Sequence, residues 1–233
     1  MAHLKPTIYH LGIDETTLGM PSGNTIIVAA QTTTEKLIQE RPHGALLKSK
    51  DYIVQSEKTK NPVVFPLYDD MKKTGLETFH WTRVCGGRFK PRELQHASIA
   101  HVVHTNGYKA HNTVLHIDAF ENRHDKTRFL IQEYLHRRGF FIPFEHIVVW
   151  GGGDKCIPLI NYADIIGANI GLSNNNKYQK YNTSWKNVPF EAQEIPFEKN
   201  RCRPLSTKDR DDLDSILDAW KNKTGNLKKV RLS

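Results

Sequence analysis

The chain has 233 residues, of which 38% are hydrophobic and 9% aromatic, enough for the packed core of one large α/β domain with or without an appendage. Its formal net charge is +8, which favours a polyanionic partner such as nucleic acid, because neutralised phosphates release condensed counterions. No apolar run approaches the roughly 20 residues of a membrane span, and the N-terminal residues lack the apolar stretch of a signal peptide, so we expect a cytoplasmic protein with no membrane partner.

Cysteine and histidine usage argues against a structural metal site. The three cysteines, Cys85, Cys156 and Cys202, are far apart and have no Cys-x-x-Cys spacing, which predicts free thiols rather than disulfides or a zinc centre. The twelve histidines are dispersed, and a pair such as His101 and His104 has no third partner at metal-binding spacing. A histidine metal site is therefore the weaker interpretation.

The first half of the chain predicts three strands. Residues 7–14 are rich in β-forming side chains, residues 18–24 hold the glycine, proline and asparagine of a turn, and residues 25–31 form a buried apolar run. Together they predict a β-hairpin. Residues 35–62 are polar and fit a short helix followed by a loop, and residues 78–84 alternate apolar and polar side chains as a third strand does.

The second half predicts alternating helices and strands. Helical periodicity covers residues 91–103, 126–138 and 157–172, and short β-rich runs at 113–118 and 146–150 lie between them. Three strands followed by helix, strand, helix, strand and helix is an α/β order, and it predicts a mixed sheet.

The remainder of the chain differs in composition. Residues 173–206 contain three consecutive asparagines, several lysines and scattered prolines and predict an irregular excursion, whereas residues 209–223 carry the apolar stripe of a helix. Residues 227–233 form a basic tail. We therefore expect one domain over residues 1–172, with residues 173–233 packed on it or appended to it.

Four acidic residues lie at strand ends or on an apolar helix, where they could bind a metal ion. Two end the first strand, one ends the strand at 113–118 and one lies on the apolar helix at 157–172: Asp14, Glu15, Asp118 and Asp164. Two divalent ions about 4 Å apart can activate water and stabilise the leaving group in phosphodiester hydrolysis, and Mg²⁺ or Mn²⁺ prefers carboxylate oxygens. The pattern predicts these four as the catalytic, metal-binding residues of a nuclease.

Each carboxylate also has a structural interpretation. Asp14 fits a residue of the hairpin turn, and Asp118 fits a cap at the end of a strand. Asp164 would need a partner such as an arginine or a backbone amide, because burying an unpaired carboxylate costs several kcal/mol. The occurrence of all three in this order of elements favours the metal site.

Three short segments resemble the ribonuclease H-like superfamily. They are Gly-Ile-Asp-Glu at 12–15, His-Ile-Asp at 116–118 and Gly-Asp-Lys-Cys-Ile-Pro at 153–158, which runs into the Tyr-Ala-Asp segment at 162–164. The resemblance covers residues 7–172 and is closest to type 2 ribonucleases H and to a group of phage- and defence-associated nuclease-like proteins. It implies a ribonuclease H-like mixed sheet and a metal-binding set made of Asp14, Glu15, Asp118 and Asp164.

The chain departs from that pattern after the Asp-Glu pair. Type 2 ribonucleases H continue with Ala-Gly-Arg-Gly, whose backbone reads RNA 2′-hydroxyls, whereas this chain continues with Thr-Thr-Leu-Gly at 16–19. Recognition of an RNA–DNA hybrid is therefore not implied. Strand alternation also points Glu15 away from Asp14 unless the strand bulges there.

The glycine-rich segment at 151–155 has two interpretations. Such loops before helices bind phosphates, but this one lacks the ending of a P-loop, so a turn beside the active site with Lys155 near a substrate phosphate is favoured. Asp154 fits a helix cap better than a metal ligand. Arg123 and Lys126, from one of the basic clusters around the motif segments, are further candidate substrate-binding residues.

Other enzyme classes fit less well. Residues 12–19 are also similar to the phosphate loop of actin-like sugar kinases, but those have glycine in place of Glu15 and need a second lobe. Cys156 and His146 are close in sequence, but nothing places them in contact for nucleophilic catalysis. We expect a two-metal nuclease acting on RNA, DNA or a hybrid, and the alternative is a non-catalytic nucleic-acid-binding or assembly protein.

Overall fold

The computed structural model describes most of the chain and builds it around one five-stranded sheet. The described residues are 7–17, 20, 24–60, 65–85, 91–105, 108–119, 124–173, 185, 188, 190, 193 and 215–223. The strands are β1 (Tyr9–Thr16), β2 (Asn24–Thr32), β3 (Thr78–Cys85), β4 (Thr113–Asp118) and β5 (Ile147–Trp150). Their order is β3-β2-β1-β4-β5, antiparallel on the β3 side of β1 and parallel on the β4 side. The predicted mixed α/β sheet is confirmed.

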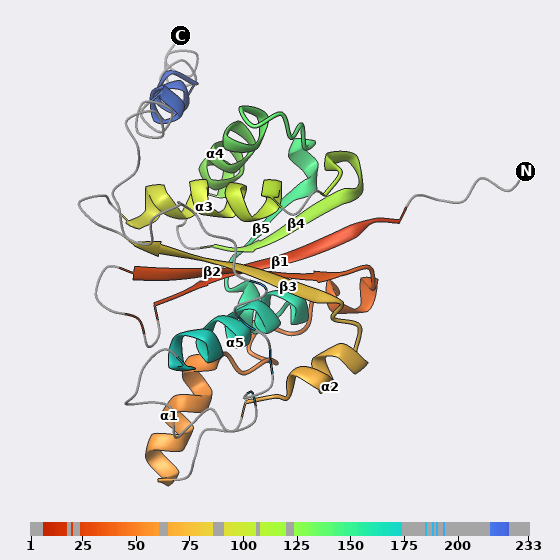
Figure 1. Ribbon diagram of the computed structural model, residues 1–233, viewed down its shortest axis with the longest axis vertical. Helices are drawn as coiled ribbons and strands as arrows, with labels where there is room; N and C mark the ends of the chain where they lie inside the picture. The colour runs from red at the N-terminus through yellow and green to blue at the C-terminus, as the bar shows by residue number, and fades with distance from the viewer. Residues whose placement is uncertain are drawn as a thin grey trace, which may run out of the picture.

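Helices cover both faces of the sheet. Figure 1 shows α3 (Pro91–Thr105) and α4 (His124–His136) on one face, and α5 (Pro158–Ser173), α1 (Ser49–Thr59) and α2 (Tyr68–Lys73) on the other. Short 3-10 helices in the described residues are η1 (Glu35–Leu37), η2 (Ala110–Asn112), η3 (Phe144–His146) and η4 (Gly153–Lys155). The described residues 215–223 are also helical.

Alternation along the strands divides the core into two layers. Leu11 and Ile13 of β1 pack into the layer under α3 and α4, whereas Ile26 and Val28 of β2 pack under α5. Neighbouring positions of a strand face opposite sides of the sheet, and β1 pairs with β2 in regular register. Asp14 therefore lies on the α5 side.

Helix α5 is apolar around its circumference because it is buried on nearly all sides. Every residue from Pro158 to Leu172 except Tyr162 is buried. The sheet covers one side of the helix, and the segment between β2 and β3, which contains α1 and α2, contributes side chains to the same core layer. Asp164 is consequently enclosed by protein on both sides.

The structure differs from expectation mainly between β2 and β3. The strands predicted at 78–84 and 146–150 are β3 and β5. A short helix followed by a loop was expected over residues 35–62, but the helix α1 lies near the end of that stretch, and α2 was not predicted. Residues 215–223 lie within the helix predicted at 209–223. The rest of that helix, the basic tail and most of the 173–206 excursion lie outside the described residues.

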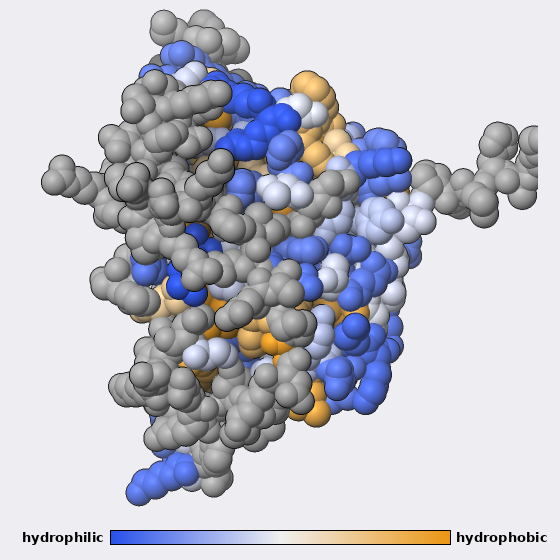
Figure 2. All heavy atoms as spheres, viewed as in Figure 1, coloured by the Kyte–Doolittle hydropathy of each residue, from blue (hydrophilic) through white to orange (hydrophobic). Residues whose placement is uncertain are grey.

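Two described pieces of the C-terminal region pack on the core. Trp185 is buried in the layer under α5, and Ile216 is buried in the layer under α3 and α4. The described surface in the right-hand part of Figure 2 is mostly hydrophilic, with smaller hydrophobic areas. Within the described part of the chain, no helix is long and apolar enough to cross a membrane.

Candidate metal centre

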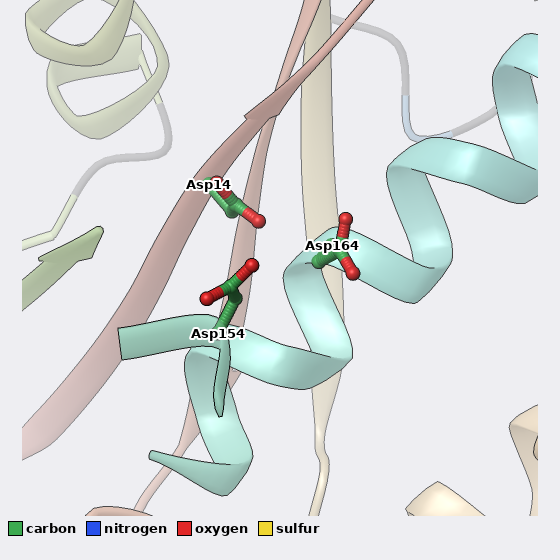
Figure 3. A group of neighbouring side chains, drawn as sticks. All are labelled: Asp14, Asp154 and Asp164. Carbon is green, nitrogen blue, oxygen red and sulfur yellow. The ribbon is translucent and has the colours of Figure 1, made fainter. Parts of the chain in front are cut away.

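Three aspartates from different elements meet at one edge of the sheet. Asp14 lies near the end of β1, Asp154 in η4 and Asp164 in the second turn of α5. One carboxylate oxygen of each lies within 4.8 Å of the others, and Figure 3 shows the three side chains gathered between β1 and the start of α5. Each side chain belongs to a residue that is 8% exposed or less. We call these three residues the acid cluster.

The topology explains why they meet. β1, β4 and β5 run parallel, so their carboxyl ends share one edge of the sheet. At that edge the chain turns from β5 through η4 into α5. α5 then packs across β1 and β2, which brings Asp164 beside Asp14.

The turn before α5 directs Asp154 into the acid cluster. Gly152 has a φ of +72°, in the left-handed region that favours glycine, and this bend starts η4. Asp118, at the end of β4, accepts the backbone N–H of Gly153 at 2.5 Å and also bonds the backbone of Asp154. The carboxylate of Asp118 thus fixes the turn that carries Asp154.

Asp118 itself stands beside the acid cluster. Its neighbour Ile117 is the partner of Ile13 in the β1–β4 register, so Asp118 adjoins Asp14 on the same face of the sheet. Its negative charge acts on Asp14, but its carboxylate bonds the η4 turn. Asp118 was predicted to be a metal ligand. In the structure it lies next to the acid cluster, and its carboxylate positions the turn that carries Asp154.

The structure changes two other sequence assignments. Asp154 was favoured as a helix cap, but it lies inside η4 and its carboxylate joins the acid cluster. Glu15 was expected to bind metal, but β1 pairs with β2 without a bulge, so its side chain faces the α3–α4 side. Its backbone N–H instead donates to Asp14 Oδ1 at 2.7 Å.

Burial and mutual repulsion disfavour the ionised form of the carboxylates in and beside the acid cluster. Burial, and then the charges of Asp164, Asp118 and Asp154, raise the pKa of Asp14 well above its usual value. Burial followed by the charge of Asp154 raises the pKa of Asp118 to about 6. Burial raises the pKa of Asp164 to about 6, although hydrogen bonds from Ser49 oppose the shift. A divalent cation would favour the ionised form of all of them.

The start of α1 stabilises the acid cluster from the side away from the sheet. The backbone N–H of Ser49 donates to Asp164 Oδ2 at 2.5 Å, and the Ser49 hydroxyl donates to Asp164 Oδ1 at 2.7 Å. The ammonium of Lys48 lies 3.3 Å from Asp154 Oδ2. A helix N-terminus favours negative charge, so α1 provides the compensating partner that a buried Asp164 was predicted to need.

Ser49→Ala should lower the free energy of unfolding by about 1–3 kcal/mol, because it removes a charge-assisted hydrogen bond from Asp164. It should also weaken Mn²⁺ binding about tenfold, the scale for residues that orient metal-binding carboxylates. Urea unfolding and Mn²⁺ titration measure the two effects. Ser49→Thr, which keeps the hydroxyl, is the matched control, and equal losses in both variants would contradict this role of the hydroxyl.

The candidate substrate-binding residues lie in different places. Lys155 is in η4, Lys126 is in α4, and Arg123 lies outside the described residues. Backbone N–H groups of the 151–155 loop bond Asp118, an anion of the protein itself. These hydrogen bonds argue against a phosphate-binding loop and favour the other interpretation, in which residues 151–155 form a turn beside the site.

Cysteine nucleophilic catalysis is not supported. Cys156 is buried, and burial raises the pKa of its thiol, which disfavours the reactive thiolate. His146 precedes β5 and its Nδ1 bonds the backbone oxygen of Thr113, whereas Cys156 follows the other end of β5. The two side chains therefore belong to opposite ends of the strand.

Comparison with known proteins assigns no family. No protein-family model matches the chain, and no curated protein sequence matches it significantly. The chemistry of the acid cluster and its neighbours therefore carries the functional conclusion.

Proposed function

We propose that this protein is a divalent-metal-dependent nuclease with a ribonuclease H-like fold, which hydrolyses phosphodiester bonds of RNA, DNA or a hybrid of the two. The observation that carries the proposal is the approach of Asp14, Asp154 and Asp164 to within 4.8 Å of one another inside the protein. Ser49 and Lys48 compensate part of the charge of Asp164 and Asp154, and a divalent cation would relieve the repulsion that the three carboxylates still exert on one another. Metal binding accounts for such a group better than a structural role does.

The donor set fits a hard cation. Carboxylate oxygens suit Mg²⁺ and Mn²⁺, whereas zinc sites are usually built from cysteine and histidine. Asp14, Asp154 and Asp164 would hold the metal, which supplies water activation and charge neutralisation at the leaving oxygen. Asp118 orients the η4 turn and adds a fourth negative charge beside the acid cluster, which favours a second ion.

Charge and strand order support the nucleic-acid substrate and the fold. The chain has a net charge of +8 even though it contains this acid cluster. Lys48 pairs with Asp154, so positive charge borders the carboxylates, and Lys155 is the residue after Asp154 in η4. Such cations attract a phosphodiester that the carboxylates alone would repel. The mixed sheet, in which three antiparallel strands are followed by helix–strand repeats, supports the proposal of a ribonuclease H-like fold.

Labelled single-stranded, duplex and hybrid substrates, each incubated with Mg²⁺, Mn²⁺ or a chelator, test the proposal. We expect cleavage of at least one substrate with metal and of none in chelator. Asp14→Asn should abolish cleavage, whereas Asp69→Asn, which changes an exposed carboxylate of α2, should leave it intact. Salt-sensitive binding without cleavage of any substrate under any metal would instead identify a non-catalytic binding protein.

A further inference from the structure

We propose that Lys48 is a built-in competitor of the metal, because its ammonium takes up the negative charge of Asp154 that a divalent cation needs. The inference rests on the proposed function, since it concerns cation binding by the same acid cluster. Lys48 must turn away before the cation binds tightly. It thereby sets the cation concentration at which the site fills.

The distances place the two cations close enough to repel each other. The Lys48 ammonium lies 3.3 Å from Asp154 Oδ2, and an oxygen of Asp154 lies within 4.8 Å of oxygens of Asp14 and Asp164. A Mg²⁺ ion stands about 2.1 Å from its ligand oxygens. An ion held by Asp154 would therefore lie only a few ångströms from the ammonium, where like charges repel strongly in a largely buried site.

The Lys48 side chain can leave while its backbone stays in place. The backbone before it is fixed near the start of α5, since Arg41 N–H donates to Cys156 O at 2.8 Å and Leu47 O accepts from Asn161 Nδ2 at 2.9 Å. The Lys48 side chain, in contrast, is 32% exposed and has a flexible four-carbon stem. A change of rotamer moves the ammonium into water without unfolding the segment.

Ser49, the next residue, should have the opposite effect on the metal. It donates to both oxygens of Asp164, and a carboxylate oxygen can accept such a bond while it also binds an ion. A neutral donor orients the ligand, whereas a cationic partner repels the ion that the ligand is to bind. Ser49 thus raises the metal affinity of the site, whereas its neighbour Lys48 lowers it.

Mn²⁺ titration of Lys48→Met tests the inference. We expect Mn²⁺ to bind about tenfold more tightly than to the unmodified protein, the scale of one partly screened charge at this separation. Lys50→Met removes an equal charge from an exposed position of α1 and should change the affinity far less. Lys48→Arg keeps the charge and should bind Mn²⁺ with the same affinity as the unmodified protein.

The outcomes separate this inference from the proposed function. Equal or weaker binding by Lys48→Met, or an equal gain in Lys50→Met, would overturn the inference and leave the proposed function in place while Mn²⁺ binding still requires Asp14. No Mn²⁺ binding by the unmodified protein or any Lys48 variant would overturn the proposed function and this inference with it. Circular dichroism checks the folding of each variant, and Lys48→Gln takes the place of a Lys48→Met that does not fold.

Discussion

Asp154→Asn should reduce metal-dependent cleavage by about a hundredfold or more, because it removes one of the three carboxylates of the acid cluster. The free energy of unfolding in chelator should fall by no more than about 1 kcal/mol, since the variant loses a partly exposed ion pair with Lys48 but relieves repulsion of Asp14. Cleavage kinetics and urea unfolding measure the two quantities. A large loss of activity without a large loss of stability would show that Asp154 binds the metal.

Asp118→Asn is the matched comparison, because it removes the same charge from a position beside the acid cluster. An amide oxygen can still accept the Gly153 N–H, so the η4 turn should hold and cleavage should fall only about tenfold. The difference in cleavage rate between the two variants then measures the loss of a metal ligand rather than the loss of a negative charge. A loss in Asp118→Asn as large as that in Asp154→Asn would put Asp118 among the metal ligands, as the resemblance implies.

Asp14 and Asp164 could be predicted from the sequence because local patterns mark them. Asp14 lies near the end of a β-rich run, and Asp164 interrupts an apolar helical stretch. A carboxylate in such a buried context has few structural explanations. The sheet was predictable for a similar reason, since hydrophobic periodicity is a local property and β4 coincides with the predicted strand at 113–118.

The place of Asp154 could not be predicted because it depends on the conformation of a turn. The left-handed φ of Gly152 and the hydrogen bonds that the η4 turn donates to Asp118 determine where the Asp154 side chain points. In the sequence the same residue precedes a helix and has the properties of a cap. Glu15 is the reverse case, because the resemblance implied a ligand and the regular pairing of β1 turns its side chain to the other face.

The partners of the acid cluster were missed because they come from the least patterned part of the chain. Ser49 and Asp164 are 115 positions apart, and no local signal links them. The start of α1 does carry one helix signal, since Asp51 accepts the backbone N–H of Lys48 at 3.2 Å. α2 carries another, with two aspartates in its first turn and two lysines in its last, which complements the helix dipole.

Gly12→Ala should lower the free energy of unfolding by about 3 kcal/mol or more. A Cβ at this position of β1 would lie 2.6 Å from the carbonyl carbon and oxygen of Leu159. Those atoms belong to the backbone of the first turn of α5, so no side-chain rotation relieves the clash and the helix must move off the sheet. The same movement would carry Asp164 away from Asp14, so Mn²⁺ affinity should fall together with stability.

Gly167→Ala is the control on the same interface between α5 and the sheet. Its Cβ would lie 3.0 Å from Thr16 Cγ2 and 3.3 Å from Val28 Cγ2, and small shifts of these methyl groups can relieve such contacts. Alanine also favours a helix over glycine by about 1 kcal/mol, so this variant should stay within about 1 kcal/mol of the unmodified protein. Urea unfolding and Mn²⁺ titration of both variants measure the difference. If Gly12→Ala is as stable as Gly167→Ala, α5 is not held against β1 at the depth that places Asp164 beside Asp14, and the metal centre loses the contact that positions it.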